Sequence, residues 1–173
     1  MSKPTDSVKY GGIRLPKGYA DIDAPFLSLD KPFVHTISVG WGDCDPAQIA
    51  YTANIPSWGL RGIEAWYKAC LGIDWYVINL HFGIGTPFVS LNFEFKSPIT
   101  PLGELLVSVY VDRVGGSSIG HCVEGHQNGS LCFTGKTVAA FVDALTMKPM
   151  PIPPNMRQSI QQYAQIQNRE YTS

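Results

Sequence analysis

Charge, long apolar runs and cysteine motifs are all scarce in this sequence, and each shortage excludes a class of protein. The 13 Lys and Arg residues nearly balance the 14 Asp and Glu residues, so the formal net charge of −1 offers no basic surface for nucleic acid. No apolar run approaches the roughly 20 residues that span a bilayer, and the N-terminus lacks the apolar core of a signal peptide. We therefore expect a cytoplasmic protein with neither a nucleic-acid nor a membrane partner.

The cysteines and histidines show no metal-ligand spacing. Cys44, Cys70, Cys122 and Cys132 contain no CxxC pair, so we interpret them as reduced thiols. Cys44 lies between two aspartates whose negative charges oppose thiolate formation, which favours packing over nucleophilic chemistry. We expect no metal and no cofactor.

The length of 173 residues fits one domain, preceded by an arm. Residues 1–31 are rich in Gly, Pro and Asp and lack periodicity, so we interpret them as an N-terminal extension to a domain over 32–173. Residues 33–41 alternate as a strand does. Residues 53–71 confine their polar side chains to one narrow stripe, which predicts a long helix that protein surrounds on most sides. The stripe consists of Ser57, Arg61, Glu64 and Lys68.

Four segments of strand character follow a predicted loop over 72–86. They cover residues 88–96, 104–114, 118–127 and 131–143, and the short turns VGGSS and QNGS predict antiparallel pairing. A proline-rich stretch then leads to a closing helix, with Asn155 as its expected N-cap. The pattern predicts an α+β domain of the hotdog type, in which an antiparallel sheet of about five strands, the last four of them a meander, curls around one central helix.

The stretch WGDCDPAQIAY (41–51) holds two aspartates just before the long helix. Such a turn is either a surface feature or a place for chemistry. The helix begins near Thr52 and Ala53, where unpaired N–H groups and the positive end of the helix dipole can stabilise an oxyanion. One such donor lowers a barrier by roughly 3 kcal/mol. A carboxylate beside these donors is what thioester cleavage requires, whereas Asp43 is expected to accept local N–H bonds in the turn.

Two motifs of the chain resemble the hotdog acyl-CoA thioesterases of the 4-hydroxybenzoyl-CoA thioesterase group. They are GDCDPAQIAYTANIPSW (42–58) and GIGTPFVSLNFEFKSP (83–98), and the resemblance extends over about residues 33–157. It implies hydrolysis of an aromatic or short-to-medium acyl-CoA, with Asp45 as nucleophile or general base. It also implies a homodimer or a dimer of dimers, in which sheets join edge to edge and Thr86 faces Asp45 of the other subunit.

The chain departs from the group at several positions. Gln48 stands where the group often has Gly, and Thr52 stands where one branch has His, so Asp45 has no neighbouring imidazole. The VGGSS turn lacks the basic residues that in several relatives hold the nucleotide of CoA. Leu60 replaces an acidic residue found in members that recognise a phenolic hydroxyl.

The expected substrate contacts lie in both motifs and between them. They are Thr52, Ala53, Trp58, Trp75, Gly85 and Thr86, with Trp58, Trp75 and Phe88 lining a narrow acyl slot. For CoA we expect Arg113, Ser117 and Ser118, with Lys136 as a possible neighbour. Among the histidines, His81 is a candidate for the pocket, whereas His35, His121 and His126 fall on strands and are expected to be packing or surface residues.

Two other functions remain open. Hotdog hydratases and dehydratases also use an Asp in a similar motif, but they pair it with a His a few residues later, and Gln48, Ile49 and Thr52 provide none. The third possibility is a module that binds an acyl-CoA without catalysis.

Overall fold

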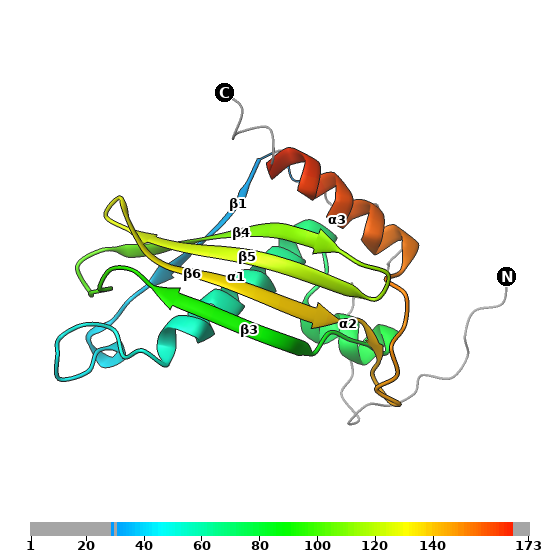
Figure 1. Cartoon of the computed structure of the whole chain (residues 1–173), viewed down its shortest axis with the longest axis horizontal. Coiled ribbons are helices and arrows are strands. Elements are labelled where there is room, and N and C mark those ends of the chain that lie inside the picture. The colour runs from blue at the N-terminus through cyan, green and yellow to red at the C-terminus, as the bar shows by residue number, and fades with distance from the viewer. Residues whose placement is uncertain (1–28, 30, 168–173) are drawn as a thin grey trace, which may run out of the picture.

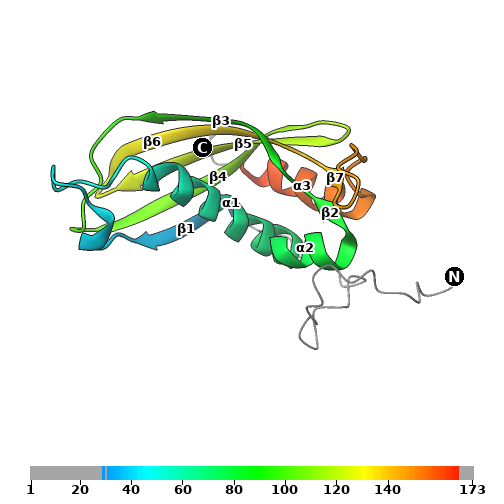
Figure 2. The same cartoon turned by 90° about the horizontal axis from the view of Figure 1, so that it is seen from below.

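The computed structural model describes residue 29 and residues 31–167, so the expected arm over residues 1–31 lies almost wholly outside the described residues. One sheet curls around one long helix (Figures 1 and 2). The strands are β1 (Phe33–Ser38), β2 (Ile84–Gly85), β3 (Phe88–Phe95), β4 (Glu104–Val114), β5 (Ser118–Gln127), β6 (Ser130–Ala140) and β7 (Val142–Asp143). The helices are the short 3₁₀ turn η1 (Trp41–Asp43), α1 (Asn54–Leu71), α2 (Trp75–Phe82) and α3 (Pro154–Gln167). The predicted hotdog arrangement is confirmed.

The five-stranded sheet has the order β1-β4-β5-β6-β3, and every neighbouring pair is antiparallel. The two predicted hairpins, β4–β5 and β5–β6, are confirmed. The prediction of a simple four-stranded meander is wrong for β3, which pairs with β6 instead of β4. No tight turn joins β3 to β4, so the local sequence does not determine which strand β3 pairs with. As a result β1 and β3 are the two edges of the sheet.

Helix α1 lies against the inner face of the sheet. The predicted polar stripe of Ser57, Arg61, Glu64 and Lys68 is exposed, and the rest of the helix supplies nine buried residues. Two of these buried residues are glycines, and they lie where α1 comes closest to the sheet. A Cβ at Gly59 would lie 2.6 Å from the Phe93 ring, and one at Gly62 would lie 2.6 Å from Val107. These glycines therefore let α1 settle directly onto β3 and β4.

The predicted loop over 72–86 instead contains α2 and β2. Asp74 precedes α2 in an extended conformation, and Gly83 ends it with φ of 63°. The segment WYVINLHF is apolar on nearly every side, so it carries no helical polar period for sequence analysis to detect. Strand β2 then pairs with β7 in a separate two-stranded sheet.

Helix α3 covers the part of β4 that extends beyond β1. It begins at Pro154, so Asn155 is a residue of the helix and not its N-cap as predicted. The Gln167 side chain pairs with the Val111 backbone as a strand would, accepting from N–H at 2.8 Å and donating to C=O at 2.7 Å. Tyr163 donates to the Val109 carbonyl and accepts from Phe33 N–H. This edge of β4 is therefore closed, while the β3 edge is open within the described chain.

Candidate active site

The turn between β1 and α1 gives its two aspartates different environments. Asp43 accepts the Gly40 N–H at 2.8 Å through Oδ2, and its carbonyl accepts from Tyr51 N–H and from the Asn54 side chain. Asp43 thus holds the turn to the start of α1, and its predicted structural role is confirmed.

Asp45 is anchored through its backbone and one carboxylate oxygen. Its N–H donates to the Ile49 carbonyl at 3.0 Å, and its Oδ1 accepts the Ala47 N–H at 2.8 Å. Among the residues that the structure describes, no hydrogen bond is formed by Oδ2. The side chain is half-buried, so one oxygen fixes its position and the other is available to a ligand.

The turn from Asp45 to Ile49, closed by their backbone hydrogen bond, requires an unusual backbone conformation. Gln48 has φ of 63°, a left-handed conformation that favours glycine. The group that the sequence resembles often has Gly at this position, and the geometry supplies the reason. Cys44 and Ala50 form an isolated bridge across the same turn, which brings the backbone just before Asp45 beside the residues that lead into α1.

Donors at the start of α1 are available just before the helix and not within its first turn. Asn54 and Ile55 donate to the carbonyls of Tyr51 and Thr52, and Pro56 has no N–H. Thr52 and Ala53 are exposed, and within the described chain their N–H groups form no hydrogen bond. The helix also lacks a side-chain N-cap. The N–H groups that we predicted as oxyanion donors are therefore unpaired, and they follow Asp45 closely in the sequence.

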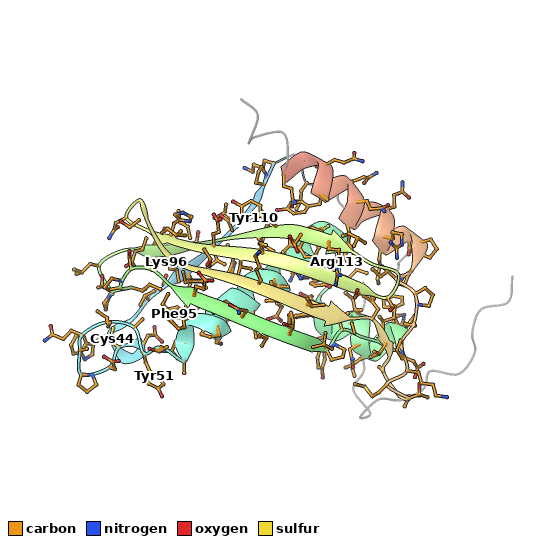
Figure 3. The ribbon with its side chains drawn as sticks, viewed as in Figure 1. Cys44, Tyr51, Phe95, Lys96, Tyr110 and Arg113 are labelled. Carbon is orange, nitrogen blue, oxygen red and sulfur yellow. The ribbon has the colours of Figure 1, made fainter. Side chains whose placement is uncertain are left out.

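A second group of predicted residues meets at the other end of α1. The Trp75 indole donates to the Thr86 hydroxyl, and its ring contacts Phe88 edge-on at 5.5 Å between centroids. The same indole stacks on Tyr67 at 5.1 Å. Figure 3 shows Cys44 and Tyr51 at one end of the molecule, where α1 begins, and α2 lies at the far end of that helix (Figure 1). Within one chain the structure does not bring Asp45 to Thr86.

The predicted acyl slot is also divided. Trp58 is buried near the start of α1, nine residues before Tyr67, which corresponds to about 13 Å along a helix. Trp75 and Phe88 touch each other, but Trp58 is not part of their contact. Gly85 is buried in β2, where a Cβ would lie 2.9 Å from the Val142 side chain. Packing against β7 accounts for this glycine without a substrate contact.

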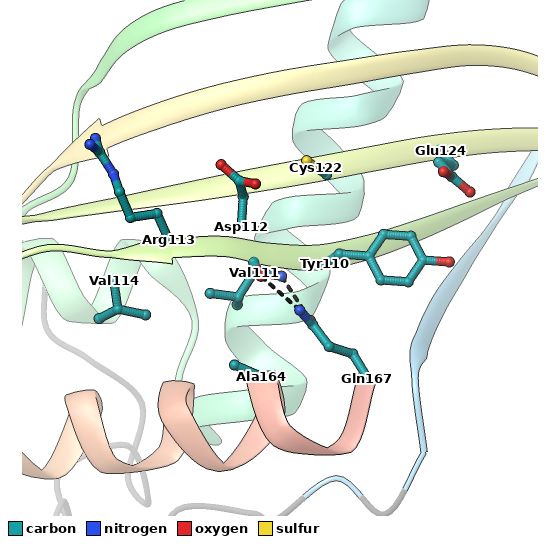
Figure 4. A pocket seen from close by; sticks show the side chains of 9 residues that line it. All are labelled: Tyr110, Val111, Asp112, Arg113, Val114, Cys122, Glu124, Ala164 and Gln167. Carbon is teal, nitrogen blue, oxygen red and sulfur yellow. Dashed lines mark hydrogen bonds between the residues drawn. The ribbon is translucent and has the colours of Figure 1, made fainter. Parts of the chain in front are cut away.

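The predicted CoA residues lie at the β4–β5 hairpin, far from Cys44 and Tyr51 (Figure 3). Arg113 is exposed and lines a cavity of about 510 Å³ on the outer face of the sheet, together with Asp112 and Glu124 (Figure 4). The cavity lining therefore contains one cation and two carboxylates, with Glu124 at the end opposite Arg113 (Figure 4), so it has no net positive charge that would attract phosphate.

Sequence analysis missed a second cation at this hairpin. Arg157 of α3 donates to the carbonyls of Gly115 and Gly116 at 2.7 and 2.9 Å. More than 40 residues separate these partners, so no local pattern could have revealed the contact. Lys136 lines a neighbouring cavity of about 410 Å³, which shares Cys122 and Glu124 with the first.

His121 was expected to be an ordinary packing residue, and the structure buries it completely. Desolvation lowers the pKa of His121 to about 3, so the imidazole is neutral at physiological pH. Neither ring nitrogen has a hydrogen-bond partner within the described residues. His81, the predicted pocket histidine, is exposed at the end of α2 and packs edge-on against Phe82.

No group of three or more His, Cys, Asp or Glu within 31–167 could hold a metal ion. Over the same range, no helix is both long and apolar enough to cross a membrane.

Comparison with known proteins places these features in a family. The Thioesterase-like superfamily matches residues 39–160, a range that includes Asp45, α1 and all the strands from β2 to β7. A crystal structure of a thioesterase-superfamily protein from Jannaschia sp. is 41% identical, with a TM-score of 0.73, and the match covers 78% of this chain and 94% of that chain.

More distant structures share the fold. A 1,4-dihydroxy-2-naphthoyl-CoA thioesterase from Synechocystis is 18% identical, with a TM-score of 0.69 and coverage of 75% of this chain and 95% of that one. A Staphylococcus aureus protein solved in complex with CoA is 14% identical, with a TM-score of 0.73 and coverage of 79% and 86%. At these identities the likeness is one of fold alone. No curated protein matches the chain.

Proposed function

The chain belongs to the thioesterase-like superfamily and is a thioester hydrolase, and from that premise we propose that it cleaves an acyl-CoA to the free acid and CoA. Asp45 is the catalytic carboxylate in this proposal. One observation carries it: a carboxylate with a free oxygen is fixed in the turn that leads to the free N–H groups of Thr52 and Ala53, where an uncapped helix begins. The substrate is an aromatic or short-to-medium acyl-CoA.

The chemistry follows from charge development at the thioester carbonyl. As the carbon becomes tetrahedral, its oxygen gains negative charge, which the N–H groups of Thr52 and Ala53 stabilise by hydrogen bonding. Asp45 acts either as nucleophile or as the base that removes a proton from water. As nucleophile, Asp45 forms an anhydride with the acyl group while the C–S bond breaks, and water then cleaves the anhydride; as base, Asp45 lets water attack the carbonyl directly and the C–S bond breaks in turn. In both routes the thiol of CoA leaves with a proton and water supplies the oxygen that balances the hydrolysis.

The proposal includes a homodimer, or a tetramer in which two such dimers associate. β3 is an open edge, and Val89, Leu91 and Phe95 along it are 65%, 49% and 50% exposed. An unpaired edge with apolar side chains is a liability in a monomer. Pairing with β3 of a second copy removes that liability and allows Thr86 of one chain to approach Asp45 of the other.

The nucleotide of CoA is expected to contribute little binding. Arg113, Ser117 and Ser118 are the proposed contacts, but the guanidinium of Arg157 is already bound to the tip carbonyls of their hairpin, and the cavity that Arg113 lines also contains Asp112 and Glu124. The acyl and pantetheine parts of the substrate then provide most of the affinity.

A panel of acyl-CoAs assayed with a thiol reagent tests the reaction class. Release of free thiol supports hydrolysis. A change in double-bond absorbance without thiol release would indicate a hydratase or dehydratase, and tight binding without either signal would indicate a non-catalytic module. Either of those results rejects the proposal.

A further inference from the structure

Four buried polar side chains without hydrogen-bond partners cluster where the second half of α1 packs on β5 and β6. Trp66, Tyr67 and His121 are each 0% exposed and Thr137 is 2% exposed. The unpartnered atoms are Trp66 Nε1, Tyr67 Oη, both ring nitrogens of His121 and Thr137 Oγ1. Buried polar groups are almost always paired, so five orphaned atoms in one place require an explanation.

These side chains face one another across the core. His121 and Thr137 are directly opposite each other on β5 and β6. The rings of Trp66 and Tyr67 lie 5.0 and 5.8 Å from the His121 ring between centroids. Two neighbouring strands and one helix thus bring these polar side chains into a single buried region.

The cluster is suited to one kind of ligand group. Trp66 donates only, whereas Tyr67, Thr137 and a neutral imidazole can each donate or accept. None of the four carries a charge that would balance an ion. The matching ligand group is therefore neutral oxygen, a hydroxyl or a carbonyl, and the surrounding aromatic rings favour a planar carrier for it.

A continuous set of aromatic contacts connects this cluster to Thr86. Tyr67 stacks on the half-buried Trp75, which contacts Phe88 and binds Thr86. In the proposed dimer, Thr86 and its neighbours meet Asp45 of the second copy. An acyl group held at that Asp45 would then lie near Trp75, whose ring stacks on Tyr67, and Tyr67 in turn contacts His121.

We propose that Trp66, Tyr67, His121 and Thr137 form a specificity site that binds the ring hydroxyl or carbonyl of an oxygenated aromatic acyl group. The inference rests on the proposed function, which supplies the acyl-CoA. It places the recognition of the ring oxygen away from Leu60. In members of the resembling group that recognise a phenolic hydroxyl, that helix position is acidic.

The test compares benzoyl-CoA with its 2-, 3- and 4-hydroxy derivatives. Thr137→Val and Tyr67→Phe remove a hydroxyl and keep the shape, so both variants should fold. Thr134→Val is the matched control, because Thr134 lies on the same strand but lines the outer cavity. For the wild type we expect kcat/KM to favour one hydroxylated substrate by on the order of 10²-fold or more. Each core variant should reduce that preference at least tenfold, and Thr134→Val should retain it.

Two results overturn the inference: a wild type without preference among these substrates, or a preference that both core variants retain. The second result would mean that ordered water alone occupies the cluster. Binding to the Asp45→Asn protein separates this inference from the proposed reaction. If the wild type hydrolyses none of the substrates, tighter binding of the hydroxylated compound that Thr137→Val abolishes would still support the site, and equal binding would reject it.

Discussion

The two ends of α1 differ in almost every physical respect. The first end begins without a side-chain cap, faces solvent and follows a turn held by backbone hydrogen bonds around Asp43 and Asp45. The second end is enclosed by aromatic rings, and its polar atoms at Tyr67 and His121 have no partners within the described residues. One end thus offers a carboxylate and free N–H donors, and the other offers shape and neutral polar groups.

Under the proposed function, this difference corresponds to a division between reaction at the first end and recognition at the second. A helix of 18 residues keeps its two ends about 27 Å apart, so one chain cannot apply both to a small acyl group. Two chains can do so if the first end of one helix meets the second end of the other. In the proposed dimer, the open β3 edge would provide the surface for that meeting.

The largest expected effect comes from removing the carboxylate at the first end. Asp45→Asn should lower kcat by about 10²–10⁴-fold, because an amide can neither attack the carbonyl nor accept a proton from water. Asp43→Asn should cost far less, since Asp43 binds the turn and not the substrate. Steady-state kinetics with circular dichroism as a folding control distinguishes the two. Equal losses in both variants, or an active Asp45→Asn, would reject the assignment.

The next effect concerns stability at the second end. His121 has a pKa of about 3 in the folded protein against an ordinary value of 6.5, so between these values the unfolded chain binds the extra proton. Stability should therefore fall as pH drops below 6.5, by about 2 kcal/mol at pH 5 from this group alone.

Urea unfolding between pH 7 and pH 5 measures that slope. His121→Leu should flatten it, whereas His126→Gln, at a half-buried histidine of the same strand, should leave it unchanged. An unaltered slope in His121→Leu would mean that other groups cause the acid sensitivity.

A smaller effect is expected in the turn of the first end. Gln48→Gly relieves the left-handed strain at φ of 63° and should raise the free energy of unfolding by at most about 1 kcal/mol, with activity retained. Gln48→Val should lower it, because a β-branched residue tolerates this conformation poorly. Thermal unfolding of both variants checks the order, and a more stable Val variant would contradict the strain.

The smallest effect is expected at the nucleotide end of the substrate. Raising salt should change KM by less than about threefold, because few exposed cations face the phosphates. An acyl-pantetheine should likewise lose little affinity. Arg113→Ala serves as the companion variant, and a steep salt dependence that it abolishes would show that Arg113 binds phosphate despite Asp112 and Glu124.

The sequence predicted those features that depend on local patterns. The polar stripe of α1 and the turns at Gly115 and Gly129 have periods or residue types that determine structure directly. The pairing of β3 with β6, the contact of Arg157 with the hairpin and the facing of His121 and Thr137 depend on long-range packing, which one sequence does not display. Asp45 was singled out because its motif resembles that of the family and the helix start follows closely in the chain, and its catalytic role stays a prediction.

Mixed dimers test most directly whether the two ends act across a pair of chains. One chain carries Asp45→Asn and the other carries Trp75→Ala, and each inactive homodimer provides the baseline. If sites combine Asp45 of one chain with Trp75 of the other, the heterodimer contains one intact site, and an equal mixture should recover about a quarter of wild-type activity. Activity that stays at the level of the two parents after subunit exchange, verified by differently tagged chains, would contradict the account.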